Sequence, residues 1–131
     1  MTITYEWRGD IENEALETLH AEGFVHPVGH TDWRARLHRH SLGWVCARES
    51  GLLAGFVNVA WDGGVHAFVL DTVVAPGSRS KGVGAGLVAA AVEGSRAAGC
   101  AWLHVDFEEY LRPFYFDACG FERTAAGLIA L

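Results

Sequence analysis

The order of hydrophobic and polar positions predicts short strands and helices joined by short turns. Residues 2–7 alternate between polar and apolar side chains, which is typical of a strand. Over residues 10–21, Ile11, Ala15 and Leu19 recur at spacings of four, which predicts an amphipathic helix with these side chains on its buried face. The chain therefore begins with a strand followed by a helix.

A turn and a second helix are expected next. Gly23 is in place to close the first helix, and residues 24–30 contain proline and glycine, so we predict a loop there. Thr31 or Asp32 can cap a short helix that ends at Ser41.

Three apolar runs occupy the middle of the chain. They span residues 42–47, 52–61 and 65–75, and the polar and glycine-rich stretches 49–51 and 62–64 separate them. Such short connections predict an antiparallel meander.

The second half of the chain predicts a crossover unit. Residues 82–98 are rich in alanine and form one apolar stripe, which indicates an amphipathic helix, and residues 101–106 read as a strand. A short helix over 111–118 and extended segments over 121–131 follow. Strand, loop, helix and strand in this order place the two strands parallel and the loop at the carboxyl edge of the sheet.

Composition narrows the class of protein. The 131 residues, half of them hydrophobic, fit one domain over 1–131. The net charge of −6 gives no footprint for nucleic acid, and no apolar run reaches the roughly 18 residues of a membrane-spanning helix. Three cysteines and a start without a signal peptide favour free thiols in the cytoplasm.

The stretch SRSKGVGAG at residues 78–86 is the strongest candidate for chemistry. Backbone N–H groups at the start of a helix lack intrahelical partners, so a loop without side chains can wrap phosphate there. Gly82, Gly84 and Gly86 permit this close approach, and Arg79 and Lys81 add positive charge. Glycines that only let the helix pack closely are the alternative interpretation.

Two familiar phosphate loops fit the stretch less well. A P-loop requires lysine where Val83 stands. A dinucleotide-binding loop requires glycine where Leu87 stands, although Asp106 lies about where its ribose-binding acid would fall, so NAD binding is kept as a rival.

Two separate motifs resemble the GNAT superfamily of N-acetyltransferases. Residues 79–84 read RSKGVG after Val74-Ala75-Pro76, like the acyl-coenzyme A loop of that family, and residues 114–121 read FYFDACGF, like its aromatic-Tyr pair before Gly-Phe. The resemblance implies an α/β (α+β) GNAT fold with a mixed sheet of about six to seven strands and about four helices. Its splayed parallel strands would form the acyl-CoA cleft.

The resemblance also implies how acetyl-CoA would bind. The backbone of Val73 and Val74 would pair with the pantetheine amides, and the pyrophosphate would lie on the amides of the loop, whose residues are Arg79, Ser80, Lys81, Gly82, Val83 and Gly84. Many relatives have asparagine where this chain has Glu108 and alanine where it has Leu111. A carboxylate at Glu108 accepts hydrogen bonds where the amide would donate one, which changes an expected pantetheine contact.

The implied chemistry is direct attack of a neutral amine on the thioester. Tyr115 resembles the tyrosine that protonates the departing thiolate in many relatives, and Asp71 stands where relatives often carry an acid that holds or deprotonates the amine. A carboxylate inside an apolar strand is costly unless it is paired or faces a cavity, so a structural hydrogen bond is the alternative for Asp71. A water chain could replace a single base, and the competing bases are His66, His104, Asp106 and Glu108.

The acceptor site is the least specified part. Histidines are frequent in the first third of the chain, but their spacing does not indicate a metal site, and none is expected. Because relatives usually build the acceptor wall between their first two helices, we expect that wall to include Phe24, His26, His30 and Trp33.

The sequence therefore predicts a cytoplasmic, acetyl-CoA dependent N-acetyltransferase that acetylates a primary amine on a small molecule or peptide. A homodimer is possible by analogy with the family, and a GNAT-fold module that binds acyl-CoA without turnover is the second hypothesis.

Overall fold

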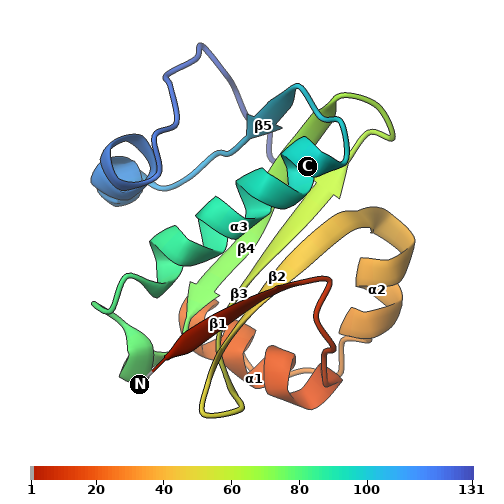
Figure 1. The fold of residues 1–131 in the computed structure, drawn as a ribbon, viewed down its shortest axis with the longest axis vertical. Coiled ribbons are helices and arrows are strands. Elements are labelled where there is room, and N and C mark those ends of the chain that lie inside the picture. Colours follow the sequence, from red (N-terminus) through yellow and green to blue (C-terminus); the bar gives the residue numbers. More distant parts are fainter. Residues whose placement is uncertain (1) are drawn as a thin grey trace.

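The computed structural model describes residues 2–131, and a single mixed sheet runs through its centre (Figure 1). Along the chain the strands are β1 (Ile3–Trp7), β2 (Ser41–Glu49), β3 (Leu52–Trp61), β4 (His66–Val74) and β5 (Trp102–His104). The longer helices are α1 (Asn13–Phe24), α2 (Trp33–His40) and α3 (Val83–Ala97). Shorter helical turns are η1 (Pro76–Ser78), η2 (Glu109–Leu111) and the π-helical η3 (Pro113–Ala118).

The sheet order β1-β2-β3-β4-β5 confirms the predicted meander and crossover. β1 to β4 pair antiparallel in sequence order, and β5 pairs parallel to β4. The helix α3 provides the connection between these parallel strands, as the pattern of the second half predicts.

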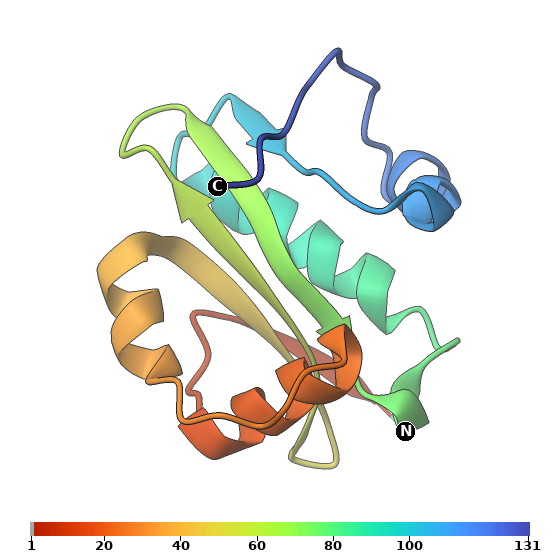
Figure 2. The same ribbon diagram turned by 180° about the vertical axis from the view of Figure 1, so that it is seen from behind.

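Each face of the sheet is covered by different helices. On one face α1 and α2 pack through Leu16, Leu19 and Leu37 against β2, β3 and β4. On the other face α3 packs through Leu87 and Ala91. Figure 1 shows α3 in front of the sheet, and Figure 2, from behind, brings α1 to the front. β4 therefore has one helical layer on each side.

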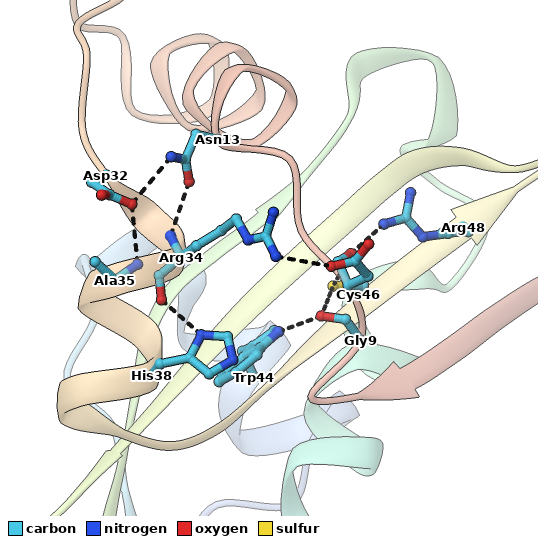
Figure 3. A network of polar contacts seen from close by, with 10 residues as sticks. Gly9, Asn13, Asp32, Arg34, Ala35, His38, Trp44, Cys46 and Arg48 are labelled. Atoms are coloured by element: carbon cyan, nitrogen blue, oxygen red, sulfur yellow. Dashed lines mark hydrogen bonds and ion pairs between the residues drawn. The ribbon is translucent and has the colours of Figure 1, made fainter.

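Hydrogen bonds fix the starts of α1 and α2 to each other. The Asp32 carboxylate caps α2 by accepting from the Ala35 N–H at 3.1 Å, which confirms Asp32 as the cap. Asn13 at the start of α1 donates to that carboxylate at 3.1 Å and accepts from the Arg34 N–H at 2.9 Å (Figure 3). The loop between the helices is thus anchored at its end.

The parallel strands separate soon after they pair. Their ladder runs only from His66 opposite Trp102 to Phe68 opposite His104, whereas β4 continues to Val74. Beyond Phe68, the described residues form no ladder with this edge of β4, and both views show the chain after β5 diverging from it (Figures 1 and 2). The edge from residue 69 to 74 is therefore free to pair with another extended group.

Two details of the first helix were predicted wrongly. The helix passes Gly23 and ends at Phe24, where Val25 adopts the left-handed conformation (φ 51°). Gly23 is needed for packing, because a Cβ there would lie 2.1 Å from Val73 Cγ2. The buried face carries Leu16 and Leu19, and Ala15 is exposed, because the larger leucine side chains gain more from burial.

The sheet also has fewer strands than the six to seven predicted. The described chain contains five, β5 is shorter than the predicted 101–106, and residues 121–131 form no strand. These last residues are mostly exposed, so they gain no buried surface that would fix them on the sheet. None of the helices within residues 2–131 has the length and apolar character needed to cross a membrane.

Candidate active site

The free edge of β4 leads to a buried tyrosine on the last helical turn. Tyr115 of η3 is only 6% exposed. Its ring stacks on Phe107 at 4.7 Å between centroids and meets Phe114 edge-on at 4.8 Å, and Phe121 adds a third aromatic contact. The phenol is therefore held in one orientation by packing on several sides.

Burial raises the pKa of Tyr115 above its ordinary value, because the charged phenolate loses more solvation than the neutral phenol. The nearby Thr72 hydroxyl on β4 partly opposes this rise in pKa. Thr72 Oγ1 itself is buried and makes no hydrogen bond of normal geometry with any residue from 2 to 131. Tyr115 is thus protonated at neutral pH and can act as a proton donor.

The glycine stretch places unpaired backbone donors at the start of α3. Gly82 caps this helix in the left-handed conformation (φ 77°), and no side chain caps the first turn. The first backbone bond that closes α3 runs from Gly86 N–H to Gly82 O at 3.1 Å, which leaves the N–H groups of Val83 to Ala85 without intrahelical partners. A Cβ added at Gly82 would meet no atom within 4 Å, so the space above this turn is open.

The other two glycines serve packing, as the alternative interpretation proposed. A Cβ at Gly84 would lie 3.1 Å from the Phe114 ring, and one at Gly86 would lie 2.2 Å from the Tyr5 hydroxyl. Gly84 therefore brings α3 against the aromatic cluster that holds Tyr115.

The two cations of the loop are directed differently. Lys81 pairs with Glu49 at 3.1 Å, and Glu49 also accepts from the Ser78 hydroxyl at 3.2 Å, so this ion pair ties the loop to the end of β2. The Lys81 hydrogen bond is the largest cause that lowers the pKa of Glu49. Arg79 donates to the Val74 carbonyl at 3.4 Å, at the end of β4.

Asp71 lies on β4 and faces α1, at a point where an irregularity interrupts the pairing of the strand. Pairing with β3 shifts between Phe56 opposite Val73 and Asn58 opposite Leu70, and Asp71 between them has a positive φ of 58°. Its carboxylate lies 2.9 Å from His20 Nε2 and accepts from the Asn58 amide at 3.3 Å. The carboxylate predicted from the apolar strand is therefore paired, and its side chain remains 27% exposed.

A second histidine extends this contact. His20 Nδ1 lies 2.7 Å from His26 Nε2, and His26 Nδ1 lies 2.7 Å from the Pro27 carbonyl oxygen. Hydrogen bonds thus connect Asp71 on β4 to the loop after α1.

Sequence reasoning did not single out His20 or Asn58. His20 lies four residues after Leu16, so it shares the buried edge of α1, and that spacing was the available signal. The Asn58 contact depends on strand register, which no local pattern specifies.

The residues predicted for the acceptor wall are divided. Phe24 and Trp33 pack against His20, with centroids at 4.5 and 4.9 Å, and His26 bonds to it. Trp33 is only 2% exposed and supports His20 from the core, and His30 joins none of these contacts.

Glu17 holds the loop and the indole together beneath this cluster. Its carboxylate accepts from the Gly29 N–H at 2.7 Å and from the Trp33 indole at 3.0 Å. These hydrogen bonds, that of Gly29 first, lower the pKa of Glu17.

The other candidate bases lie elsewhere. His66 and His104 bond to each other at 2.8 Å where β4 and β5 pair. His66 lies five positions before Asp71, about 16 Å along the strand, and His104 lies opposite Phe68, three positions or about 10 Å before it. Asp106 and Glu108 are exposed after β5. No group of three or more possible metal ligands is formed by the residues from 2 to 131.

The structure thus contains an unpaired strand edge, a buried phenol and a helix start without a side-chain cap. Sequence comparison identifies the family. The profile of the Acetyltransferase (GNAT) family matches residues 8–121. The chain belongs to this family. A comparison with curated protein sequences found no match.

Solved structures share the fold. A GNAT-family acetyltransferase from Streptococcus pneumoniae TIGR4 has 22% identity and a TM-score of 0.76, with 99% of this chain and 98% of that chain covered. Glucosamine-6-phosphate N-acetyltransferase from Arabidopsis thaliana has 17% identity and a TM-score of 0.80, with 98% of each chain covered. The aminoglycoside N-acetyltransferase AAC(6')-Iy in complex with CoA has 19% identity and a TM-score of 0.79, with 99% and 94% covered.

Proposed function

We propose that this acetyltransferase-family protein transfers the acetyl group of acetyl-CoA to a primary amine. The observation that carries the proposal is the position of Tyr115, a buried and protonated phenol beside the β4 edge that has no partner strand. A proton donor at this place is what a thiolate leaving group requires.

The chain's own groups fit acetyl-CoA. Beyond Phe68 the outer edge of β4 has no partner strand, so backbone groups at Val73 and Val74 that face this edge can pair with the amides of the pantetheine arm, as a strand would, once the Val74 carbonyl is released from Arg79. The open turn at Gly82 offers the N–H groups of Val83 to Ala85, at the positive end of α3, to a pyrophosphate. The family membership and the similar chain solved with CoA support the same assignment.

The proposed reaction is a direct transfer. The lone pair of the amine attacks the thioester carbonyl, a C–N bond forms, the C–S bond breaks, and the sulfur leaves with its electron pair. Tyr115 gives its proton to that sulfur and regains one from solvent, and the amine's surplus proton passes to Asp71, which then releases it to solvent. The products are an amide and coenzyme A, so atoms and charge balance.

The acceptor class follows from the charges near Asp71. A carboxylate that is partly exposed attracts a cationic amine before its deprotonation, and the net charge of −6 favours the same approach. Phe24 and His26 are the candidate side chains for its wall, because Trp33 is buried and His30 lies outside the contacts around His20. Aminoglycoside and glucosamine-6-phosphate N-acetyltransferases share this fold, so amino sugars belong in the first screen.

The test is release of the coenzyme A thiol from acetyl-CoA with a panel of amino sugars, polyamines, amino acids and peptides. Amine-dependent thiol release, with the acetylated amine identified by mass, supports N-acetyl transfer. If the protein binds acetyl-CoA but releases no thiol with any class of amine, N-acetyl transfer is contradicted and the non-catalytic acyl-CoA-binding module is favoured.

A further inference from the structure

The hydrogen-bonded series from Asp71 to Pro27 contains three consecutive links. They join Asp71 Oδ1 to His20 Nε2 at 2.9 Å, His20 Nδ1 to His26 Nε2 at 2.7 Å, and His26 Nδ1 to the Pro27 carbonyl at 2.7 Å. All three distances are those of ordinary hydrogen bonds, so each link is expected to hold one proton.

The three links of this series need one proton more than two neutral histidine rings supply. A carbonyl and a carboxylate only accept, so the two rings must fill all three links, but two neutral imidazoles carry only two protons. The Asn58 amide already donates to the other Asp71 oxygen. Without a third proton, two acceptors face each other at one link, which is unfavourable.

The third proton can occupy any of three places. It can lie on Asp71, on His20 or on His26 with every link filled, and moving it requires no movement of heavy atoms. When His20 Nε2 takes a proton from Asp71, His20 Nδ1 gives its own to His26 Nε2. The two-proton form can therefore take a proton at Asp71 and pass the excess to His26, whose Nδ1 proton leaves for solvent when its bond to the Pro27 carbonyl opens, because that carbonyl only accepts.

We propose that Asp71, His20 and His26 form a proton relay that takes the surplus proton of the acceptor amine and delivers it to solvent at the loop after α1. This inference rests on the proposed N-acetyl transfer. The three residues act together as the base: Asp71 takes the proton, and His20 and His26 pass it on.

The surroundings hold the relay in place. His20 is packed between Phe24 and Trp33, and its side chain is 16% exposed, whereas Asp71 is 27% exposed. Asp71 keeps its left-handed backbone conformation, which aspartate and asparagine tolerate better than most residues.

Few charged groups face this series. On α1, the Glu17 carboxylate interacts electrostatically with His26. On α2, the Arg36 guanidinium lies over the Trp33 ring, 4.8 Å from the ring centroid. The Trp33 ring in turn contacts His20. From the sheet, β3 contributes the neutral Asn58 and β2 contributes Ser41, whose hydroxyl donates to Asn58 Oδ1.

The first test needs no enzyme activity. Histidine ring ¹⁵N spectra of the whole protein are recorded between pH 5 and 9. Because His20 and His26 share one proton in the relay, we expect their ¹⁵N signals to change together over one pH interval. Asp71→Asn should abolish this joint change, since its amide can donate to His20 Nε2 and fill the link. His40→Gln, an exposed histidine at the end of α2, is the control and should leave both signals unchanged.

Two histidines that titrate independently, and that ignore Asp71→Asn, would overturn the relay whatever the protein catalyses. If instead the joint change is present and no amine is acetylated, the proton-sharing series stands and the proposed function fails.

The second test uses the amine found by thiol release. His20→Gln should lower kcat about 10²-fold near neutral pH with little change in KM, and the loss should shrink as pH rises, because solution then supplies the neutral amine. The double variant with Asp71→Asn should be no slower than the slower single variant, because the residues act as a unit. His26→Gln provides the same readout if the His20 variant fails to fold.

Losses that multiply in the double variant, or a His20→Gln rate that falls equally at every pH, would overturn the catalytic role of the relay.

Discussion

Tyr115 acquires its proposed chemistry at the scale of a single residue, from the rings around it. Phe107, Phe114 and Phe121 remove the phenol from water without offering it a charge, so the neutral form is favoured. The same burial fixes the direction of the hydroxyl. Burial by these rings therefore determines both the position and the protonation state of the Tyr115 hydroxyl, and substitution of Tyr115 tests both.

Replacing Tyr115 with phenylalanine should lower kcat about 10²-fold, because the leaving thiolate loses its proton donor, while the affinity for acetyl-CoA changes little. Steady-state rates and equilibrium binding of acetyl-CoA measure the two effects. Tyr110→Phe, at an exposed tyrosine nearby, is the matched control and should keep full activity. Equal kcat in the two variants would remove Tyr115 from the reaction.

The raised pKa of Tyr115 also fixes a direction for pH dependence. The pKa of Tyr115 in the folded protein lies above its ordinary value of 10. Loss of the phenol proton should therefore not lower the rate until the pH exceeds about 10. A fall in kcat between pH 8 and 9 that Tyr115→Phe abolishes would contradict this.

At the scale of elements, the loop after α1 depends on Glu17. This carboxylate joins the Gly29 backbone to the Trp33 indole, so it fixes the loop that carries His26 onto the two helices. Its pKa lies below the usual 4.5, and the stabilisation from its ionised form is therefore present above pH 4.5 and lost as the pH falls through the folded-state pKa.

Glu17→Gln should lower Tm at pH 7, because the glutamine amide turns a donor toward one of the two N–H groups. The difference in Tm from the parent protein should shrink as the pH falls below about 4.5, where the parent's carboxylate also becomes protonated. Melting curves between pH 3.5 and 7 measure this. Glu22→Gln, at an exposed position on the same helix, should show a small difference that is independent of pH, and the same behaviour in Glu17→Gln would refute the assigned role.

The turn before α3 allows a similar comparison. Gly82 has a positive φ in open space, so Gly82→Ala adds backbone strain of ~1–2 kcal/mol without a steric clash. Gly77→Ala also meets no atom, and Gly77 has no positive φ, so its stability should stay close to that of the parent. Urea denaturation compares the two free energies of unfolding, and equal values would contradict the requirement for glycine at 82.

At the scale of the whole molecule, the parts predicted correctly depend on local patterns. The meander, the crossover through α3 and the cap at Asp32 follow from alternation, short turns and capping chemistry, all of which act between neighbours in sequence. Helix α1 shows the limit. Ala15 and Leu16 are both apolar, and only the sheet beneath the helix decides which one is buried.

The candidate site divides in the same way. The loop at 79–84 and Tyr115 were predicted because each lies in a contiguous motif, and their binding and catalytic roles stay predictions. The length of β5, the bulge at Asp71 and its contact with His20 depend on residues far apart in sequence, which periodicity does not relate. The proton relay arises entirely from such long-range contacts.

We propose that the unpaired edge of β4 and the turn before α3 bind acetyl-CoA, and the melting temperature of the protein with and without acetyl-CoA tests this most directly. A ligand at a hundredfold excess over its Kd stabilises the folded state by about 2.7 kcal/mol, which for a domain of this size raises Tm by roughly 10 °C. We expect such a rise with acetyl-CoA and none with NAD. No rise with acetyl-CoA at saturating concentration, or a rise with NAD alone, would contradict it.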